Sequence, residues 1–253
     1  MLYIVGTGLN GPKSITIEGL DAIRECPHVY LDTYTSFQSG FSVQDFEKAL
    51  GKSVLPAKRG FLEGKVPILD LAAEEDVALL VIGDPLMATT HNMVRKMATE
   101  KGVETKVLGN SSIVNALPTR AGLSIYRMGA PVSIPFSSEK FVPVSPYAKI
   151  LKNLDTGLHT LLLLDLQDQR TMEPAVVLSS LLEMGRRLGD SRINGETMII
   201  AGSMIGSNRE CMCITSMRYL KDMENRPPMS FIVPAELTED EEAFVKAFCT
   251  TYP

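Results

Sequence analysis

The chain has 253 residues, of which 45% are hydrophobic and 22% charged, as in a globular protein with one large domain or two modest ones. Its formal net charge is −5, whereas proteins that bind nucleic acids usually carry an excess of basic residues, so we do not expect a nucleic-acid-binding protein. The N-terminus carries no secretion-signal pattern and the apolar runs are too short to cross a bilayer, so we expect a cytoplasmic protein that does not bind membranes.

Strand and helix patterns alternate through the first hundred residues. Expected strands occupy residues 2–5, 28–32, 53–56, 77–83 and 103–108. Expected helices occupy residues 15–26, 42–50, 66–75 and 91–101. The first helix has Ile17, Leu20 and Ile23 on its apolar face, and the second has Ser42 as its N-cap. Because such alternation returns each strand to the same direction, the sequence predicts an α/β fold with a parallel sheet.

The second half alternates less regularly. Expected strands occupy residues 131–136, 159–166, 197–205, 210–214 and 229–234. Expected helices occupy residues 113–123, 173–188 and 237–249. The prolines of the first of these strands predict an edge position, and Thr238 with Glu241 predicts a capping box. We therefore expect two α/β domains, residues 1–112 and 113–253, with a boundary near residues 109–125.

The segment GTGLNG, residues 6–11, fits the dinucleotide-binding pattern G-x-G-x-x-G. Asp32 follows about where such proteins keep a ribose-binding carboxylate. However, Pro12 comes directly after the third glycine, and the amphipathic helix begins only near Ile15, too late for a nucleotide-cradling turn. Three alternatives stay open on local sequence alone: a dinucleotide loop, a loop for another ligand, and a structural turn.

Two further strands end in similar loops, GDPLMATTH (83–91) and GNSSIVNA (109–116). Ligands of open parallel sheets bind at the carboxyl ends of the strands, so we expect the three loops to converge on one site. Gly83 and Pro85 predict a sharp turn that leaves Asp84 at the rim, free to meet a cation or a hydroxyl. The four cysteines form no C-x-x-C pair, and we predict no metal site.

The series MLYIVGTGL, ITIEGLDAI, VYLDTYTS, VIGDPLMATTH, NSSIVNA, VSIPF, SPY and LHTLLLLDL closely resembles the diphthine synthase family, which is tetrapyrrole-methylase-like. The likeness runs from Met1 to about Leu166 and resumes at PPMSFIVP (227–234). It implies a methyltransferase that binds S-adenosyl-L-methionine in a cleft between two α/β domains and releases S-adenosyl-L-homocysteine. The implied cofactor-binding residues are Leu9, Asp84, Met87, Ser112, Ile113, Leu163, Ile205 and Met229.

The chain departs from that family at three methionines. Met87 stands where a glycine is common, Met204 where an arginine is frequent and Met229 where a histidine is frequent. We expect Met87 to intrude on a position that is usually kept small. Apolar walls and backbone groups are able to hold the cofactor without specific side chains, so the site survives such changes.

The resemblance further implies a substrate, a partner and an assembly. The substrate is the amino group of 3-amino-3-carboxypropyl-histidine on translation elongation factor 2, which is methylated to diphthine, and the enzyme is expected to be a homodimer. Three methyl groups are expected for the archaeal type and a fourth, on the carboxylate, for the eukaryotic type. No catalytic base is assigned, and Asp84, Asp165 and His91 are candidates by location only.

Aromatic and basic side chains are candidates for substrate contacts. Tyr34, Tyr126 or Tyr147 is a candidate to face the trimethylammonium product. Lys58 and Arg59, in the loop 58–66, are candidate docking charges beside the loop 33–41. Two rival hypotheses stay open: a related corrin or tetrapyrrole methyltransferase, and a non-catalytic homologue that only binds S-adenosylmethionine.

Overall fold

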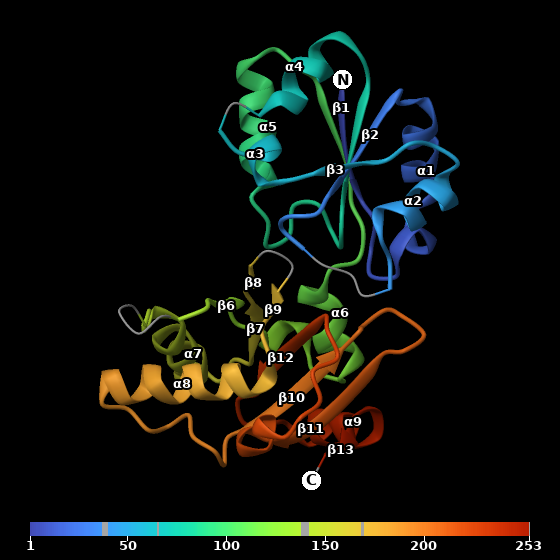
Figure 1. Ribbon diagram of the computed structural model, residues 1–253. Coiled ribbons are helices and arrows are strands. Elements are labelled where there is room, and N and C mark those ends of the chain that lie inside the picture. The colour runs from blue at the N-terminus through green and yellow to red at the C-terminus, as the bar shows by residue number, and fades with distance from the viewer. Residues whose placement is uncertain (37–39, 65, 138–141, 168–169, 253) are drawn as a thin grey trace. The chain divides into compact units, whose positions relative to one another are not determined.

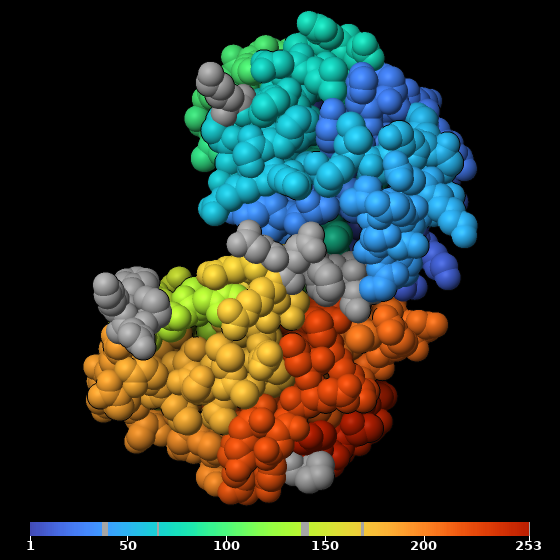
Figure 2. All heavy atoms as spheres, viewed as in Figure 1, coloured from blue at the N-terminus to red at the C-terminus, as the bar shows by residue number. Residues whose placement is uncertain are grey.

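A computed structural model describes residues 1–36, 40–64, 66–137, 142–167 and 170–252 (Figure 1). The chain divides into two compact units, Met1–Ile113 and Val114–Pro253. This division falls one residue beyond the boundary expected from the sequence. Within each unit, side chains fill the space between the ribbons, as the space-filling view shows (Figure 2).

The first unit is built on a five-stranded parallel sheet of order β3-β2-β4-β1-β5. Its strands are β1 (Leu2–Gly6), β2 (His28–Asp32), β3 (Leu55–Ala57), β4 (Val77–Val81) and β5 (Thr105–Leu108). β4 is buried at every position, as expected for a strand covered on both faces. The predicted parallel sheet is confirmed.

Helices cover both faces of this sheet (Figure 1). They are α1 (Ile17–Glu25), α2 (Val43–Leu50), α3 (Arg59–Leu62), α4 (Pro67–Glu74) and α5 (His91–Glu100). Ser42 caps α2 in a reciprocal box with Asp45, and Gly51 ends that helix in the left-handed region. The apolar face predicted for α1 is partly wrong. Ile17 is 79% exposed because it is the first residue of the helix, while Ile23 is buried.

The second unit is built on a six-stranded mixed sheet of order β13-β11-β10-β12-β7-β6. Its strands are β6 (Val132–Ile134), β7 (Thr160–Leu164), β10 (Met198–Ser203), β11 (Cys211–Ser216), β12 (Met229–Val233) and β13 (Thr250–Thr251). β8 (Leu166–Gln167) and β9 (Arg170–Thr171) pair antiparallel in a separate two-stranded sheet. β6 lies at an edge, as its prolines predicted.

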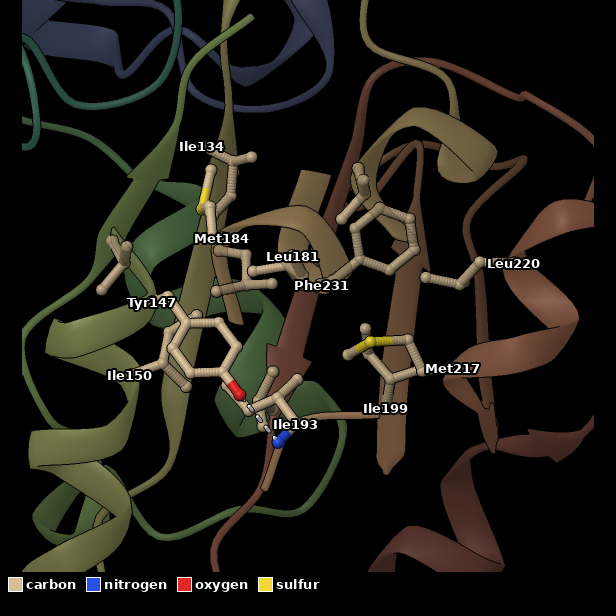
Figure 3. Close-up of a cluster of buried hydrophobic side chains, with 14 of the residues drawn as sticks. Ile134, Tyr147, Ile150, Leu181, Met184, Ile193, Ile199, Met217, Leu220 and Phe231 are labelled. Carbon is tan, nitrogen blue, oxygen red and sulfur yellow. Dashed lines mark hydrogen bonds between the residues drawn. The ribbon is translucent and has the colours of Figure 1, made fainter. Parts of the chain in front are cut away.

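Four α-helices of the second unit are described: α6 (Ile113–Arg120, whose first residue ends the first unit), α7 (Ser145–Asp155), α8 (Pro174–Leu188) and α9 (Glu239–Phe248). α7 and α8 pack on one face of the sheet and enclose the largest apolar cluster (Figure 3). On the other face, Leu117 of α6 lies so close to Gly202 of β10 that a Cβ on that glycine would be 2.3 Å from the leucine side chain. No helix among the described residues is long and apolar enough to span a membrane.

Glu241, in the first turn of α9, joins distant parts of the second unit. Oε1 accepts the backbone N–H of Ser124 at 3.0 Å and lies 3.1 Å from Nε2 of His159. Oε2 accepts the N–H of Thr238 at 3.1 Å and a guanidinium N–H of Arg127. Burial raises the pKa of Glu241, but the backbone donors and His159 lower it further, to about 2. The predicted capping box is confirmed as part of this larger network.

Candidate functional site

Three loops meet at the carboxyl edge of the five-stranded sheet. β4, β1 and β5 are neighbours and run parallel, so the chain leaves all three at the same edge. The first two loops are joined directly, because Gly8 N–H donates to the Gly83 carbonyl at 3.1 Å and Gly83 N–H donates back at 2.9 Å. The predicted convergence is confirmed, and it defines the candidate site of the first unit.

Asn110 ties the loop after β5 to the loop after β1. Its side-chain amide donates to the carbonyl of Gly6 at 2.9 Å and to that of Ser14 at 2.8 Å. A Cβ on Gly6 would lie 2.8 Å from the Asn110 Cβ, and one on Gly8 would lie 2.8 Å from its Oδ1. The glycines therefore make room for Asn110, which the sequence reasoning did not single out. The signal was present, because a glycine and an asparagine directly follow an expected strand.

Asp84 fixes the loop after β4. Oδ1 accepts the backbone N–H groups of Leu86 at 2.9 Å and Met87 at 3.1 Å, and Oδ2 accepts that of Asn110 at 3.1 Å. The carboxylate is therefore not free, because both oxygens already hold the backbone of two loops, but it is only partly buried, and its contact with a cofactor stays a prediction. The turn itself forms where Gly83 and Pro85 predicted it.

The other predicted contacts of the first unit lie around the same edge. Leu9 and Ile113 are half-buried, and Ser112 is buried. Met87 is 41% exposed. Its intrusion on the cofactor stays a prediction. The next residue, Ala88, has a φ of +57°, a left-handed conformation that costs a residue with a side chain about 1–2 kcal/mol.

Beneath these loops, Asp32 and His91 face each other with 1% of each side chain exposed. Asp32 Oδ1 accepts the backbone N–H groups of Tyr34 at 2.7 Å and Thr35 at 3.1 Å, and Oδ2 accepts the Thr35 hydroxyl. Oδ2 also lies 3.2 Å from Nε2 of His91. Burial raises the pKa of Asp32, but these contacts outweigh it and hold the pKa below its usual range. Neither side chain is exposed enough to meet a ribose or an incoming amine.

The three predicted cofactor residues of the second unit gather at one end of its sheet. Met229 begins β12 and pairs with Ser203 at the end of β10, so Ile205 follows close by. Leu163 belongs to β7, whose pairing with β12 runs toward Met229 at the carboxyl end of β7. Met204, between Ser203 and Ile205, has a φ of +51°. Whether these residues bind the cofactor stays a prediction.

Asp165 lies at that same end, just after β7. Its Oδ2 accepts the backbone N–H of Phe136 at 3.3 Å and an amide N–H of Gln167 at 3.2 Å. Unlike His91, it is only partly buried.

The aromatic candidates differ sharply in accessibility. The prediction for Tyr147 is wrong, because its ring, on α7, is fully buried. Its hydroxyl accepts the backbone N–H of Ile193 at 3.1 Å (Figure 3) and donates to Asp190 at 2.9 Å. Tyr126 is 93% exposed. Tyr34 already faces the guanidinium of Arg59, 5.0 Å from its ring centre.

The candidate docking charges lie in α3 and just before it. Arg59 is paired with Glu63 at 2.9 Å, so its charge is partly balanced. Parts of both candidate docking loops, residues 37–39 and 65, lie outside the described residues. Among the residues that the structure does describe, no group of three histidine, cysteine or acidic side chains is placed to hold a metal ion.

A parallel sheet with converging glycine loops, followed by a second α/β unit, is the architecture of one class of methyltransferases. Residues 1–218 match the family model of Tetrapyrrole (Corrin/Porphyrin) Methylases, and the chain belongs to that family. It is therefore a methyltransferase, and the dinucleotide interpretation of GTGLNG is wrong.

Within this family, the relatives are diphthine synthases, as the sequence resemblance predicted. The chain is 39% identical to the diphthine synthase of Methanothermobacter thermautotrophicus over 94% of this chain and 91% of that protein. It is 34% identical to the diphthine methyl ester synthase of Saccharomyces cerevisiae over 92% of this chain and 83% of that protein. The crystal structure of a putative diphthine synthase from Entamoeba histolytica superposes with a TM-score of 0.89 at 32% identity, covering 100% of this chain and 99% of that chain.

Proposed function

We propose that this protein transfers methyl groups from S-adenosyl-L-methionine to the amino group of 3-amino-3-carboxypropyl-histidine on translation elongation factor 2, giving diphthine. The observation that carries the proposal is the likeness to diphthine synthases over more than nine tenths of the chain. We further propose that the protein acts in the cytoplasm as a homodimer.

The residues of the first unit fit a methyl donor of this kind. S-adenosylmethionine, when bound, supplies an electrophilic methyl group on a sulfonium. Leu9 and Ile113 offer partly exposed apolar surface to an adenosine, and the Asp84 carboxylate places negative charge at the same edge. Gly83 has a φ of +81°, a left-handed conformation that lets the chain turn sharply as it leaves β4. These features suit a ligand that carries a flat aromatic base and a cationic sulfonium.

The amine does not require a strong base. An α-amino group titrates near pH ~8, so about a tenth is neutral at pH 7, a cost of roughly 1.4 kcal/mol. Alignment of the amine with the methyl group supplies on the order of 7–11 kcal/mol. Each transfer forms one C–N bond, breaks one C–S bond and releases the amine proton to water.

Of the three acid–base candidates, Asp84 and His91 are already engaged within the loops of the first unit. His91 is in addition too deeply buried to receive a proton from the amine. Asp165 is the one that remains partly exposed, and we assign it no proton transfer.

The test is direct. Purified protein is incubated with S-adenosylmethionine and elongation factor 2 that carries the precursor histidine, and the modified peptide is analysed by mass spectrometry. We expect a mass gain of three methyl groups on that peptide and none on elongation factor 2 without the precursor. Methylation of a tetrapyrrole supplied in a parallel incubation, with none of elongation factor 2, would overturn the proposal in favour of the first rival hypothesis. Donor binding with no transfer to either substrate would favour the second.

A further inference from the structure

We propose that the buried Asp32–His91 pair pins the end of the loop 83–90 in the shape that binds the methyl donor, which makes His91 a positioning residue. This inference rests on the donor site proposed above. It concerns how the loop is held, and not which substrate is methylated.

The loop is fixed at its beginning and at its end by different groups. At the beginning, the Asp84 carboxylate accepts three backbone N–H groups, two within the loop and one from Asn110. At the end, His91 is the first residue of α5, and its ring faces Asp32 at the end of β2. A segment held at both ends in this way has few conformations available to it.

Between these two fixed points lies Ala88, with a φ of +57°. Residues with side chains rarely keep this conformation unless the surrounding structure imposes it, and such strain tends to occur at ligand-binding segments. The adjacent Met87 is one of the residues predicted to contact the donor. Release of either end would allow Ala88 to relax and would displace Met87 with it.

A polar ring at this buried position is explained by its contact with Asp32. Within the described part of the chain, neither ring nitrogen of His91 makes a hydrogen bond of good geometry, although Nε2 lies within ion-pair distance of Asp32, so the ring bears part of the cost of burying polar atoms. A phenyl ring would fill the same space without that cost. The 3.2 Å approach of Nε2 to the Asp32 carboxylate is therefore the contact that distinguishes a histidine here from an apolar ring.

Asp32 is a rigid anchor for this contact. It ends a strand that is paired on both sides, and its carboxylate is already fixed by the backbone N–H groups of Tyr34 and Thr35. The position of Asp32 therefore does not depend on His91. The end of the loop, in contrast, is held against this anchor through the side chain of His91.

The experiment compares His91→Gln with the matched control His28→Gln. His28 begins β2 at the opposite edge of the same sheet, where it contacts Glu75 at 3.0 Å and is partly exposed. Each variant is titrated with S-adenosylhomocysteine by calorimetry, and amide hydrogen exchange is followed in residues 86–90. We expect His91→Gln to weaken binding about tenfold, which corresponds to about 1.4 kcal/mol, and to speed exchange in the loop. We expect His28→Gln to do neither.

A second substitution tests the strain at Ala88. Glycine adopts a positive φ at no steric cost, so Ala88→Gly added to His91→Gln should recover part of the lost affinity. If His91→Gln does not fold, Asp32→Asn keeps a backbone-accepting oxygen, removes the charge that faces His91, and should weaken binding in the same direction.

Three results would overturn the proposal: unchanged loop exchange in the His91 or Asp32 variant, an equal effect of His28→Gln, or no recovery with Ala88→Gly. If the unmodified protein bound S-adenosylhomocysteine but did not methylate elongation factor 2, the proposed substrate would fail while this inference stood. If it did not bind S-adenosylhomocysteine, the proposed donor site would fail, and with it the role of His91 in that site.

Discussion

Replacement of Glu241 by glutamine tests whether the buried carboxylate holds the second unit together. In the folded protein its four donors come from Ser124, Thr238, His159 and Arg127, which belong to segments far apart in the sequence. A glutamine would keep the shape of the side chain but would turn an amide N–H₂ group toward two of these donors. One pair of donors would therefore lose its acceptor inside the protein.

The size of the effect follows from the pKa of Glu241. A fall from the usual 4.5 to about 2 means that folding favours the ionised form by about 3 kcal/mol, at 1.36 kcal/mol per pKa unit. The side chain is 3% exposed, so solvent screens little of this interaction. We expect Glu241→Gln to lower the free energy of unfolding by about 3 kcal/mol at pH 7. For a chain of this length that is a fall of about 6–12 °C in Tm.

Urea unfolding followed by circular dichroism measures this difference, with Glu242→Gln as the matched control. Glu242 is the next residue, is exposed and pairs with Lys246 in the same helix, so its loss should cost less than about 0.5 kcal/mol. Because the folded-state pKa of Glu241 is depressed, its stabilisation is complete above pH ~4.5 and disappears as the pH falls toward 2. A difference below about 1 kcal/mol at pH 7, or one that persists unchanged at pH 2, would refute the reasoning.

Three further predictions concern the candidate site and the core. Gly8→Ala should abolish binding of S-adenosylhomocysteine in calorimetry, while Gly51→Ala, which has a similar φ but open space around it, should bind normally. Asn110→Ala should weaken the same binding at least tenfold, because two loops lose their shared hydrogen bonds; unchanged affinity would contradict this. Tyr147→Phe should cost about 1–2 kcal/mol in urea unfolding, since it leaves the buried N–H of Ile193 unpaired, and should leave the number of methyl groups added unchanged.

Local patterns in the sequence predicted most of the fold. Capping residues act over three residues: Ser42 is the predicted N-cap, and Thr238 forms the predicted capping box. The helix α7 was missed, because it begins at Ser145–Pro146 and its N-terminus carries no side-chain cap. The exposure of Ile17 was also missed, because periodicity identifies a face of a helix but not the residue at which the neighbouring sheet stops covering it.

The sequence predicted where the candidate site lies, but not which residues contact one another there. Parallel strands bring their carboxyl ends together, so the three loops were expected to meet. Which group each side chain contacts depends on distances across those loops. Asp84 turns its oxygens toward backbone N–H groups, and Asn110 lies beside Gly6 and Gly8, contacts between residues about 26 and about 100 positions apart. No periodicity or local motif encodes such pairs.

The same contacts explain why GTGLNG is unlike the dinucleotide loop that it matches in letters. In that motif the helix N-terminus directly follows the glycines and is free to bind a pyrophosphate. Here a 3₁₀ turn, Gly11–Ser14, separates them from α1, and the hydroxyl of Thr16 already accepts the backbone N–H of Gly19. Gly6 and Gly8 serve instead to let Asn110 approach the backbone. The ligand therefore depends on the residues that contact the glycine loop from other segments, such as Asn110. A motif of six consecutive residues contains no information about those contacts.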